Sequence, residues 1–209
     1  MQARLWHRDE PEQTISYRGL ILISHGFSGH ARSLERYASA LARTGYLVTA
    51  VDHDDLKGLR DGQGHNDPLI ARSRHIELTL QYLRDSGYIN KGTPIGTLGY
   101  SMGAFSVMLA SGFSVDFSAH KQACVKQSAA DNMILCNPRM QKRINKLVGF
   151  TLAPAVVAQE NPIQAIAILS PSYLDLIDFT NHITIPPILL VASEHDEYIH
   201  YPISVVNWP

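Results

Sequence analysis

A serine with a glycine two residues away on each side is the first feature that points to chemistry. The segment Gly99-Tyr-Ser-Met-Gly103 lies between an apolar run at 94–99 and a segment of helical pattern from Met102. A serine on such a strand-to-helix turn presents its hydroxyl at the carboxyl edge of a sheet, and the glycines let the backbone turn without clashes. The positive end of the helix also stabilises negative charge there. We therefore predict that Ser101 is a nucleophile.

A second glycine-rich turn, His25-Gly-Phe-Ser-Gly29, follows an earlier apolar run. In serine hydrolases with a strand-to-helix nucleophile, a loop of this kind supplies one backbone N–H to the oxyanion hole, and the residue after the nucleophile supplies the other. We predict that the N–H groups of Phe27 and Met102 are these donors. His25 is expected to support the turn rather than to act as a base.

A carboxylate follows the last apolar run of the chain, in the segment Ser193-Glu-His-Asp196. A position after that run, and after the serine in chain order, is where the acid of a Ser-Asp-His triad belongs. We predict Asp196 as the acid, with Asp175 and Asp178 as alternatives because they follow the preceding apolar run. The competing interpretation is that Asp196 only caps a helix.

Apolar runs alternate with segments of helical periodicity. We expect strands at 19–25, 46–51, 94–99, 163–169 and 186–192, and helices at 31–44, 69–85 and 102–110. This alternation predicts an α/β fold: a doubly wound, mostly parallel sheet with helices on both faces. The pattern is lost at 112–161. We interpret residues 113–160 as a mobile, mostly helical cap insertion in a single domain that spans 1–209.

The composition is that of an ordinary globular protein. The 209 residues are 45% hydrophobic and 18% charged, and the net charge is -1. The numbers of acidic and basic residues are nearly equal, so the sequence lacks the excess of positive charge that is typical of proteins that bind DNA or RNA. No apolar run approaches the ~18 residues of a membrane span. We predict no nucleic-acid partner and no membrane span. No signal peptide is visible, so the chain as written is expected to be soluble and cytoplasmic, with export as the alternative if the N-terminus is truncated.

These residues together resemble an α/β-hydrolase, and more narrowly the bacterial predicted dienelactone hydrolases related to platelet-activating-factor acetylhydrolases. The matching segments are 24–29, 45–53, 76–83, 99–103, 165–171 and 185–196. The resemblance extends over residues 19–200. It implies hydrolysis of a small-molecule carboxylic ester through an acyl-serine intermediate, without a cofactor.

The general base is the member of the triad that the sequence does not supply in the expected place. A serine hydroxyl needs a base, normally histidine, and in the resembled fold it follows one further strand after the acid. His200 lies one helical turn from Asp196, too close for that role, while His53 and His65 are the alternatives near the same sheet edge. We therefore expect a chain clipped at both ends.

Such a chain would lack the C-terminal strand and have little room for leading antiparallel strands. We expect a very weak esterase, because the serine would lack its base. The alternative function is a non-catalytic protein of the same fold that binds a small ligand or a partner.

Other clusters are interpreted structurally. The segments 52–55 and 195–200 contain histidine and carboxylate side chains but no recognised zinc spacing, so we predict no metal site. A solvated helix face is expected for a basic run made of Arg139, Lys142, Arg143 and Lys146, with a patch that binds an acidic substrate as the alternative. In the resembled family, Cys124 and Cys136 would pair if the protein is exported; otherwise they are core thiols.

Overall fold

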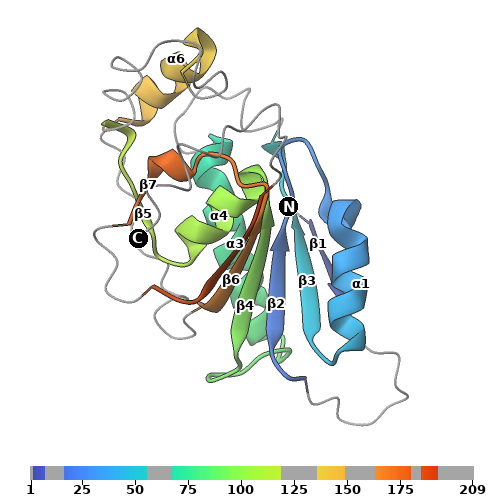
Figure 1. Cartoon of the computed structure of the whole chain (residues 1–209). Helices are drawn as coiled ribbons and strands as arrows, with labels where there is room; N and C mark the ends of the chain where they lie inside the picture. Colours follow the sequence, from blue (N-terminus) through green and yellow to red (C-terminus); the bar gives the residue numbers. More distant parts are fainter. Residues whose placement is uncertain are drawn as a thin grey trace.

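A six-stranded sheet forms the centre of the molecule (Figure 1). The computed structural model describes residues 2–7, 17–55, 67–118, 136–148, 163–179 and 185–192. The sheet has the order β1-β3-β2-β4-β6-β8. Its strands are β1 (Gln2–Trp6), β2 (Leu20–Ser24), β3 (Leu47–Asp52), β4 (Ile95–Tyr100), β6 (Ile163–Leu169) and β8 (Ile188–Val191). All five predicted strands are therefore confirmed, and they run parallel to one another.

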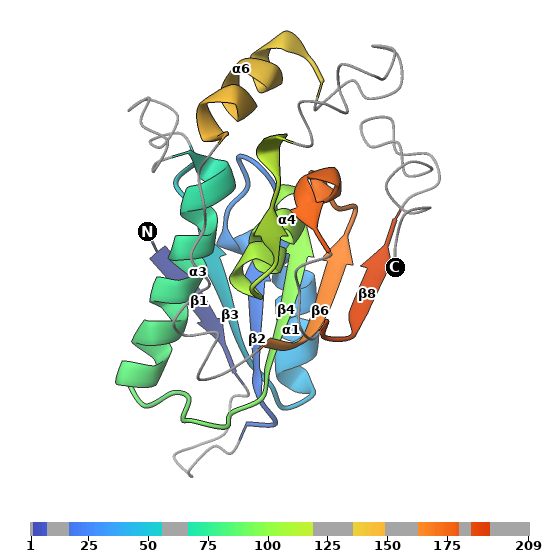
Figure 2. The same ribbon diagram turned by 90° about the vertical axis from the view of Figure 1, so that its left-hand side faces the viewer.

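Helices cover both faces of this sheet, as the alternating pattern predicts (Figure 2). The 3-10 helix η1 (Ala31–Leu34) and α1 (Glu35–Arg43) lie on one face, and α3 (Pro68–Asp85) and α4 (Met102–Ala110) lie on the other. Proline at the first position of α3 and the Asp67 side chain, which accepts from the Leu69 N–H, begin that helix as expected for a capped terminus. The predicted α/β architecture is confirmed.

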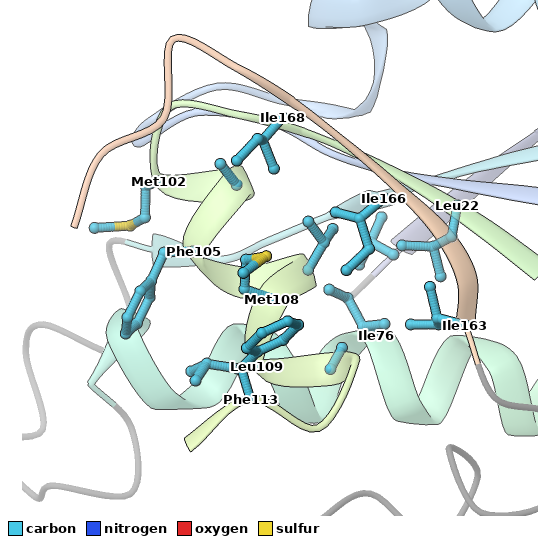
Figure 3. Packing of buried hydrophobic residues seen from close by; sticks show 14 of the residues in the cluster. Leu22, Ile76, Met102, Phe105, Met108, Leu109, Phe113, Ile163, Ile166 and Ile168 are labelled. Atoms are coloured by element: carbon cyan, nitrogen blue, oxygen red, sulfur yellow. The ribbon is translucent and has the colours of Figure 1, made fainter. Parts of the chain in front are cut away.

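Two apolar clusters pack against the two faces. Side chains of a strand alternate between faces, so Leu22 of β2 belongs to the cluster under α3 and α4, whereas Ile23 belongs to the cluster under α1. Figure 3 shows part of the larger cluster, in which Phe105 and Met108 of α4 contribute to the same core as Ile166 of β6. Every residue of α4 is buried. The helix that follows Ser101 is thus enclosed by packing.

The N-terminal residues differ from the expectation. Residues 2–6 form β1, which pairs antiparallel with β3 in a register that places Gln2 opposite Asp52 and Trp6 opposite Val48. We expected little room for leading antiparallel strands, and the residues before β2 that the structure describes nevertheless form one such strand. The strand is mostly exposed, so its sequence lacks the continuous apolar run that revealed the central strands, and only pairing at the sheet edge defines it.

The predicted cap region is described in part. It contains β5 (Ser114–Val115), which pairs antiparallel with β7 (Ile177–Asp178), and α6 (Pro138–Leu147), which lies beyond the carboxyl ends of the parallel strands (Figure 1). A short 3-10 helix, η3 (Leu174–Leu176), precedes β7. The remaining cap residues lie outside the described ranges, so a mostly helical cap stays a prediction.

One residue of the basic run is not solvated. Arg143 donates from Nε to Asp67 Oδ2 at 2.6 Å and from its terminal nitrogen to Asp67 Oδ1. Both side chains are mostly buried, at 16% and 14% exposed. The expectation of a fully solvated face is wrong at this position, because the arginine joins α6 to the N-terminal end of α3.

Candidate active site

Ser101 occupies the turn between β4 and α4, as predicted. Its backbone has φ 52° and ψ −121°, and its side chain makes no capping hydrogen bond to the helix that it precedes. A serine at this position usually caps the helix. Positive φ costs a non-glycine residue about 1–3 kcal/mol and persists only where the surroundings impose it. The turn therefore keeps the Ser101 hydroxyl away from its ordinary structural role.

Backbone contacts impose this conformation. The Ser101 N–H donates to Leu169 O at 2.9 Å, and Ser101 O accepts from the N–H groups of Ala104 at 3.0 Å and Ser172 at 3.2 Å. Strands β4 and β6 are neighbours in the parallel sheet. The carboxyl end of β6 thus stabilises the turn between β4 and α4, although β6 is not one of the two elements that the turn connects.

The two glycines of the motif are required by close packing. A Cβ on Gly99 would lie 2.5 Å from Ala104 Cα, and a Cβ on Gly103 would lie 2.0 Å from Ser24 O. Both separations are far below any contact that real Cβ atoms make. The sequence argument that these glycines let the backbone close without clashes agrees with this geometry. Gly103 additionally brings α4 against the end of β2.

The turn at 25–29 lies beside Ser101. A Cβ on Gly26 would lie 3.4 Å from Ser101 Cβ and 3.1 Å from the ring of Tyr100. Strands β2 and β4 pair in parallel with Ser24 opposite Gly99, which brings their carboxyl ends together. Two segments separated by about seventy residues in sequence therefore meet because adjacent parallel strands end at the same edge.

The two predicted oxyanion donors have no competing acceptor. Within the ranges that the structure describes, neither the Phe27 N–H nor the Met102 N–H is hydrogen-bonded. Met102 is the first residue of α4 and is 1% exposed, whereas the Phe27 side chain is 46% exposed. The Met102 N–H belongs to the positive end of the helix dipole. In the described residues neither N–H group therefore has an acceptor that a ligand would have to displace.

His25 supports the turn, as expected, and is not available as a base. The His53 N–H donates to His25 Nε2 at 3.0 Å, so the proton of the neutral ring is on Nδ1, which donates to Gly26 O at 2.7 Å. Burial lowers the pKa of His25 below its usual value. Both ring nitrogens are therefore occupied by the backbone.

Neither ring nitrogen of His53 is hydrogen-bonded to Ser101 in the described residues. Its Nε2 lies 2.9 Å from Ser24 Oγ and its Nδ1 lies 3.2 Å from His75 Nδ1. Burial, followed by the charge of Arg72, lowers its pKa well below the usual value. The hypothesis that His53 approaches the serine does not fit these contacts, because one ring nitrogen of the buried His53 is bonded to Ser24 and the other lies against the half-buried His75.

The side-chain partner of Ser101 is another serine. Ser101 Oγ lies 3.0 Å from Ser172 Oγ, a residue just after β6. In the described part of the chain, no histidine is hydrogen-bonded to the Ser101 hydroxyl. The sequence reasoning missed Ser172, and its one local signal is the Ser170-Pro-Ser172 sequence directly after a buried strand.

Of the remaining candidates for the acid and the base, the structure describes only some. Asp196, His200 and His65 lie outside the described residues. Asp178 is in β7, where its backbone pairs with Ser114, and Asp175 is in η3. The role of each as acid or base stays a prediction.

Cys136 is disulfide-bonded, and the other cysteine of the chain, Cys124, lies outside the described residues. The described residues contain no group of three or more His, Cys, Asp or Glu side chains placed to hold a metal ion. In the same ranges, no helix is both long and apolar enough to cross a membrane.

A buried ion pair next to the 25–29 turn was also missed. Arg72 is completely buried in α3 and is bonded to Asp55, just after β3. The sequence carries a signal: Arg72 lies three residues after Leu69 and four before Ile76, on the apolar face of the helix. A charged residue on such a face needs a buried partner.

Comparison with models of known protein families assigns the chain to a family. A family model described as serine aminopeptidase, S33, matches residues 15–165 of the 209. The chain belongs to this hydrolase family. Together with the mostly parallel sheet and the helices on both faces, the match assigns the α/β-hydrolase fold. The matched range includes Ser101 and both predicted oxyanion donors.

Solved structures also resemble this member of the S33 family. A thioesterase domain from the curacin biosynthetic pathway is 17% identical over 81% of this chain and 41% of its own, with a TM-score of 0.39. A lipase in its open form is 16% identical over 81% and 39%, with a TM-score of 0.41. MenH from S. aureus is 13% identical over 81% and 42%, with a TM-score of 0.38. The chain spans about two fifths of the length of these proteins. A search of curated proteins finds no significant match.

Proposed function

We propose that the chain acts on carboxylic esters as a serine hydrolase, through an acyl-serine intermediate, with Ser101 as the nucleophile. One observation carries this proposal. The Ser101 hydroxyl is held at a strained turn where it does not cap its own helix, next to two backbone N–H groups that lack an acceptor in the described residues. Strain of this kind is found at functional sites, and paired free donors suit a developing oxyanion.

The proposed reaction begins when Ser101 Oγ attacks the ester carbonyl carbon and loses its proton to solvent water, since in the described residues no histidine is bonded to that hydroxyl. The carbonyl oxygen becomes an oxyanion that accepts from the Phe27 and Met102 N–H groups. When the C–O bond to the leaving group breaks, the alkoxide takes the proton and leaves as an alcohol. Water then attacks the acyl-serine, which releases the acid and restores the Ser101 hydroxyl.

Esters are the substrate class that this arrangement fits best. An amine leaves a tetrahedral intermediate only after it is protonated by a well-placed acid, whereas a stabilised alkoxide or phenolate needs less help. In the described residues the Ser101 hydroxyl is bonded to Ser172 and not to a histidine. An ester, including a lactone of the dienelactone type, is therefore a better substrate for this site than a peptide. Asp196 is our proposed acid.

The same contact favours a second candidate, a non-catalytic protein that binds a small ligand in the space beside Ser101. The Ser101–Ser172 hydrogen bond satisfies the hydroxyl without a base. In that case the free N–H groups would bind a carboxylate or a carbonyl oxygen without any bond being broken.

Hydrolysis of p-nitrophenyl acetate and covalent labelling by a fluorophosphonate separate the two candidates. We expect weak turnover, about 10³–10⁴-fold above the uncatalysed rate, the level that oxyanion stabilisation and binding alone provide. Ser101→Ala should abolish labelling, because the fluorophosphonate bonds covalently to Ser101 Oγ, while Ser86→Ala, at the exposed C-terminal end of α3, should leave labelling unchanged. Wild-type protein that is folded but neither turns over the ester nor is labelled would contradict the hydrolase proposal and favour ligand binding.

A further inference from the structure

We propose that Arg72 and Asp55 are positioning residues that set the orientation of the Gly26–Phe27 peptide and so direct the Phe27 N–H toward the space beside Ser101. The role of that N–H as an oxyanion donor rests on the proposed function, but the orientation of the peptide does not. Five hydrogen bonds of this ion pair carry the inference.

The ion pair is fully buried. Arg72 donates from Nε to Asp55 Oδ1 at 2.7 Å and from a terminal nitrogen to Asp55 Oδ2 at 2.5 Å. The side chains are 1% and 2% exposed. A buried ion pair contributes little net stability, because the loss of hydration offsets the attraction between the charges. Stability alone is therefore a weak explanation for an arginine on the apolar face of α3.

The remaining donors of the guanidinium reach the 25–29 turn. One terminal nitrogen donates to His25 O at 2.6 Å, and the other donates to Gly26 O at 3.0 Å. Asp55 Oδ2 accepts from the Ser28 N–H at 3.0 Å. The ion pair thus binds the backbone on both sides of Phe27 and contacts no polar atom of Phe27 itself.

The geometry of a trans peptide connects these contacts to the free N–H. In a trans peptide the C=O and N–H point in opposite directions, and no cis peptide occurs in the described residues. Gly26 O accepts from Arg72, from His25 Nδ1 and from the Gly29 N–H at 3.1 Å. The Phe27 N–H must therefore point away from Arg72, and it has no acceptor among the described residues.

Arginine is the side chain that can make this set of contacts. Its planar guanidinium carries five donors in a fixed fork, and here it donates to one carboxylate and two successive carbonyl groups. A lysine ammonium in the same place keeps the charge but cannot donate from two separated nitrogens. Arg72→Lys therefore removes the fixed set of hydrogen bonds to the carbonyl groups of the 25–29 turn, while it preserves the positive charge beside Asp55.

The experiment compares Arg72→Lys with Arg143→Met. Arg143 forms a similar two-pronged pair with Asp67, also at α3, but it does not contact the 25–29 turn, so it controls for the loss of an arginine–carboxylate pair. For p-nitrophenyl acetate we expect Arg72→Lys to lower kcat by about 10²–10³-fold with little change in KM, as the loss of one oxyanion donor does. Arg143→Met should leave kcat within about threefold of the wild type.

A second measurement does not need activity. Crystal structures of the wild type and of Arg72→Lys should show the Gly26–Phe27 peptide rotated in the variant, with Gly26 O no longer directed at position 72. If the wild type hydrolyses no ester, the proposed function fails, and the peptide orientation alone decides the inference. If Arg72→Lys does not fold, Asp55→Asn, which keeps the volume and one acceptor oxygen, takes its place with the same two readouts. An unchanged peptide orientation in the folded variant, or a kcat equal to that of Arg143→Met, would overturn the proposal.

Discussion

Ser101 Oγ lies 3.0 Å from Ser172 Oγ, and the backbone of Ser172 donates to Ser101 O at 3.2 Å. The two residues come from the carboxyl ends of adjacent strands, β4 and β6. Because the two hydroxyl groups are hydrogen-bonded to each other, the Ser101 hydroxyl is held in one orientation, and where Ser101 is the donor that bond must break before its proton can leave. Ser172 is thus expected to restrain the proposed nucleophile.

Ser172→Ala tests this restraint. A neutral hydrogen bond contributes about 1 kcal/mol, so its removal should speed fluorophosphonate labelling of Ser101 by up to about fivefold and change the free energy of unfolding by about 1 kcal/mol or less. The control is Ser106→Ala, which removes a buried hydroxyl from α4 that bonds only Met102 O. Slower labelling in Ser172→Ala would instead mean that Ser172 assists the reaction.

Gly103→Ala should strongly destabilise the protein. The new Cβ would lie 2.0 Å from Ser24 O, a backbone atom of a central strand that cannot move aside. We expect a loss of about 3 kcal/mol or more in the free energy of unfolding, at or above the upper end of overpacking costs. In the control Gly96→Ala, the nearest atom is the flexible end of Ile21 at 3.0 Å, so a loss within about 1 kcal/mol is expected. Denaturant unfolding measures both, and equal losses would contradict the packing argument.

Stability should fall in mild acid because three histidines are held neutral. Burial lowers the pKa of His25, His53 and His75 in the folded state. Below the ordinary histidine pKa of about 6.5, the unfolded chain binds protons that the folded chain does not, so stability is present above that pH and is lost as the pH falls below it. Each such proton contributes up to about 1.4 kcal/mol per pH unit.

His53→Asn checks this pH dependence. Unfolding curves recorded between pH 7.5 and pH 5, conditions that we choose to bracket the ordinary histidine pKa of ~6.5, should show a smaller decrease in stability for the variant than for the wild type. The asparagine cannot be protonated, so one of the three contributions disappears. A wild-type free energy of unfolding that does not change over this pH range would show that the histidine cluster is not buried as described.

The Arg143–Asp67 pair should hold α6 against α3. Arg143→Met removes a two-pronged, mostly buried ion pair, and hydrogen bonds to charged groups contribute about 1.5–3 kcal/mol. Amide exchange in α6 should therefore become at least about tenfold faster. Lys146→Met, on the exposed side of the same helix, is the matched control and should leave exchange unchanged. Unaltered exchange in Arg143→Met would mean that burial of Ile144 and Leu147 alone holds the helix.

Sequence patterns determined those features that depend on neighbours along the chain. A short, mostly apolar run indicated each parallel strand, and the spacing of glycines around Ser101 indicated the turn that β4 and α4 form. These signals are local because strand alternation, helix periodicity and tight turns are properties of a few consecutive residues. The predicted donors Phe27 and Met102 followed from the same turns.

Tertiary structure alone decided which distant side chains meet. Ser172 reaches Ser101 only because β6 pairs with β4, and Arg72 reaches the 25–29 turn only because α3 packs against β3, the neighbour of β2 in the sheet. Likewise, β1 is a strand only because the edge of β3 offers it hydrogen bonds. Such contacts depend on the order of strands in the sheet, and no local pattern encodes that order. Arg72 shows both contributions. Its position on an apolar helix face indicates, from the sequence, that it needs a buried partner. The fold determines that its partners are Asp55 and the backbone beside Ser101.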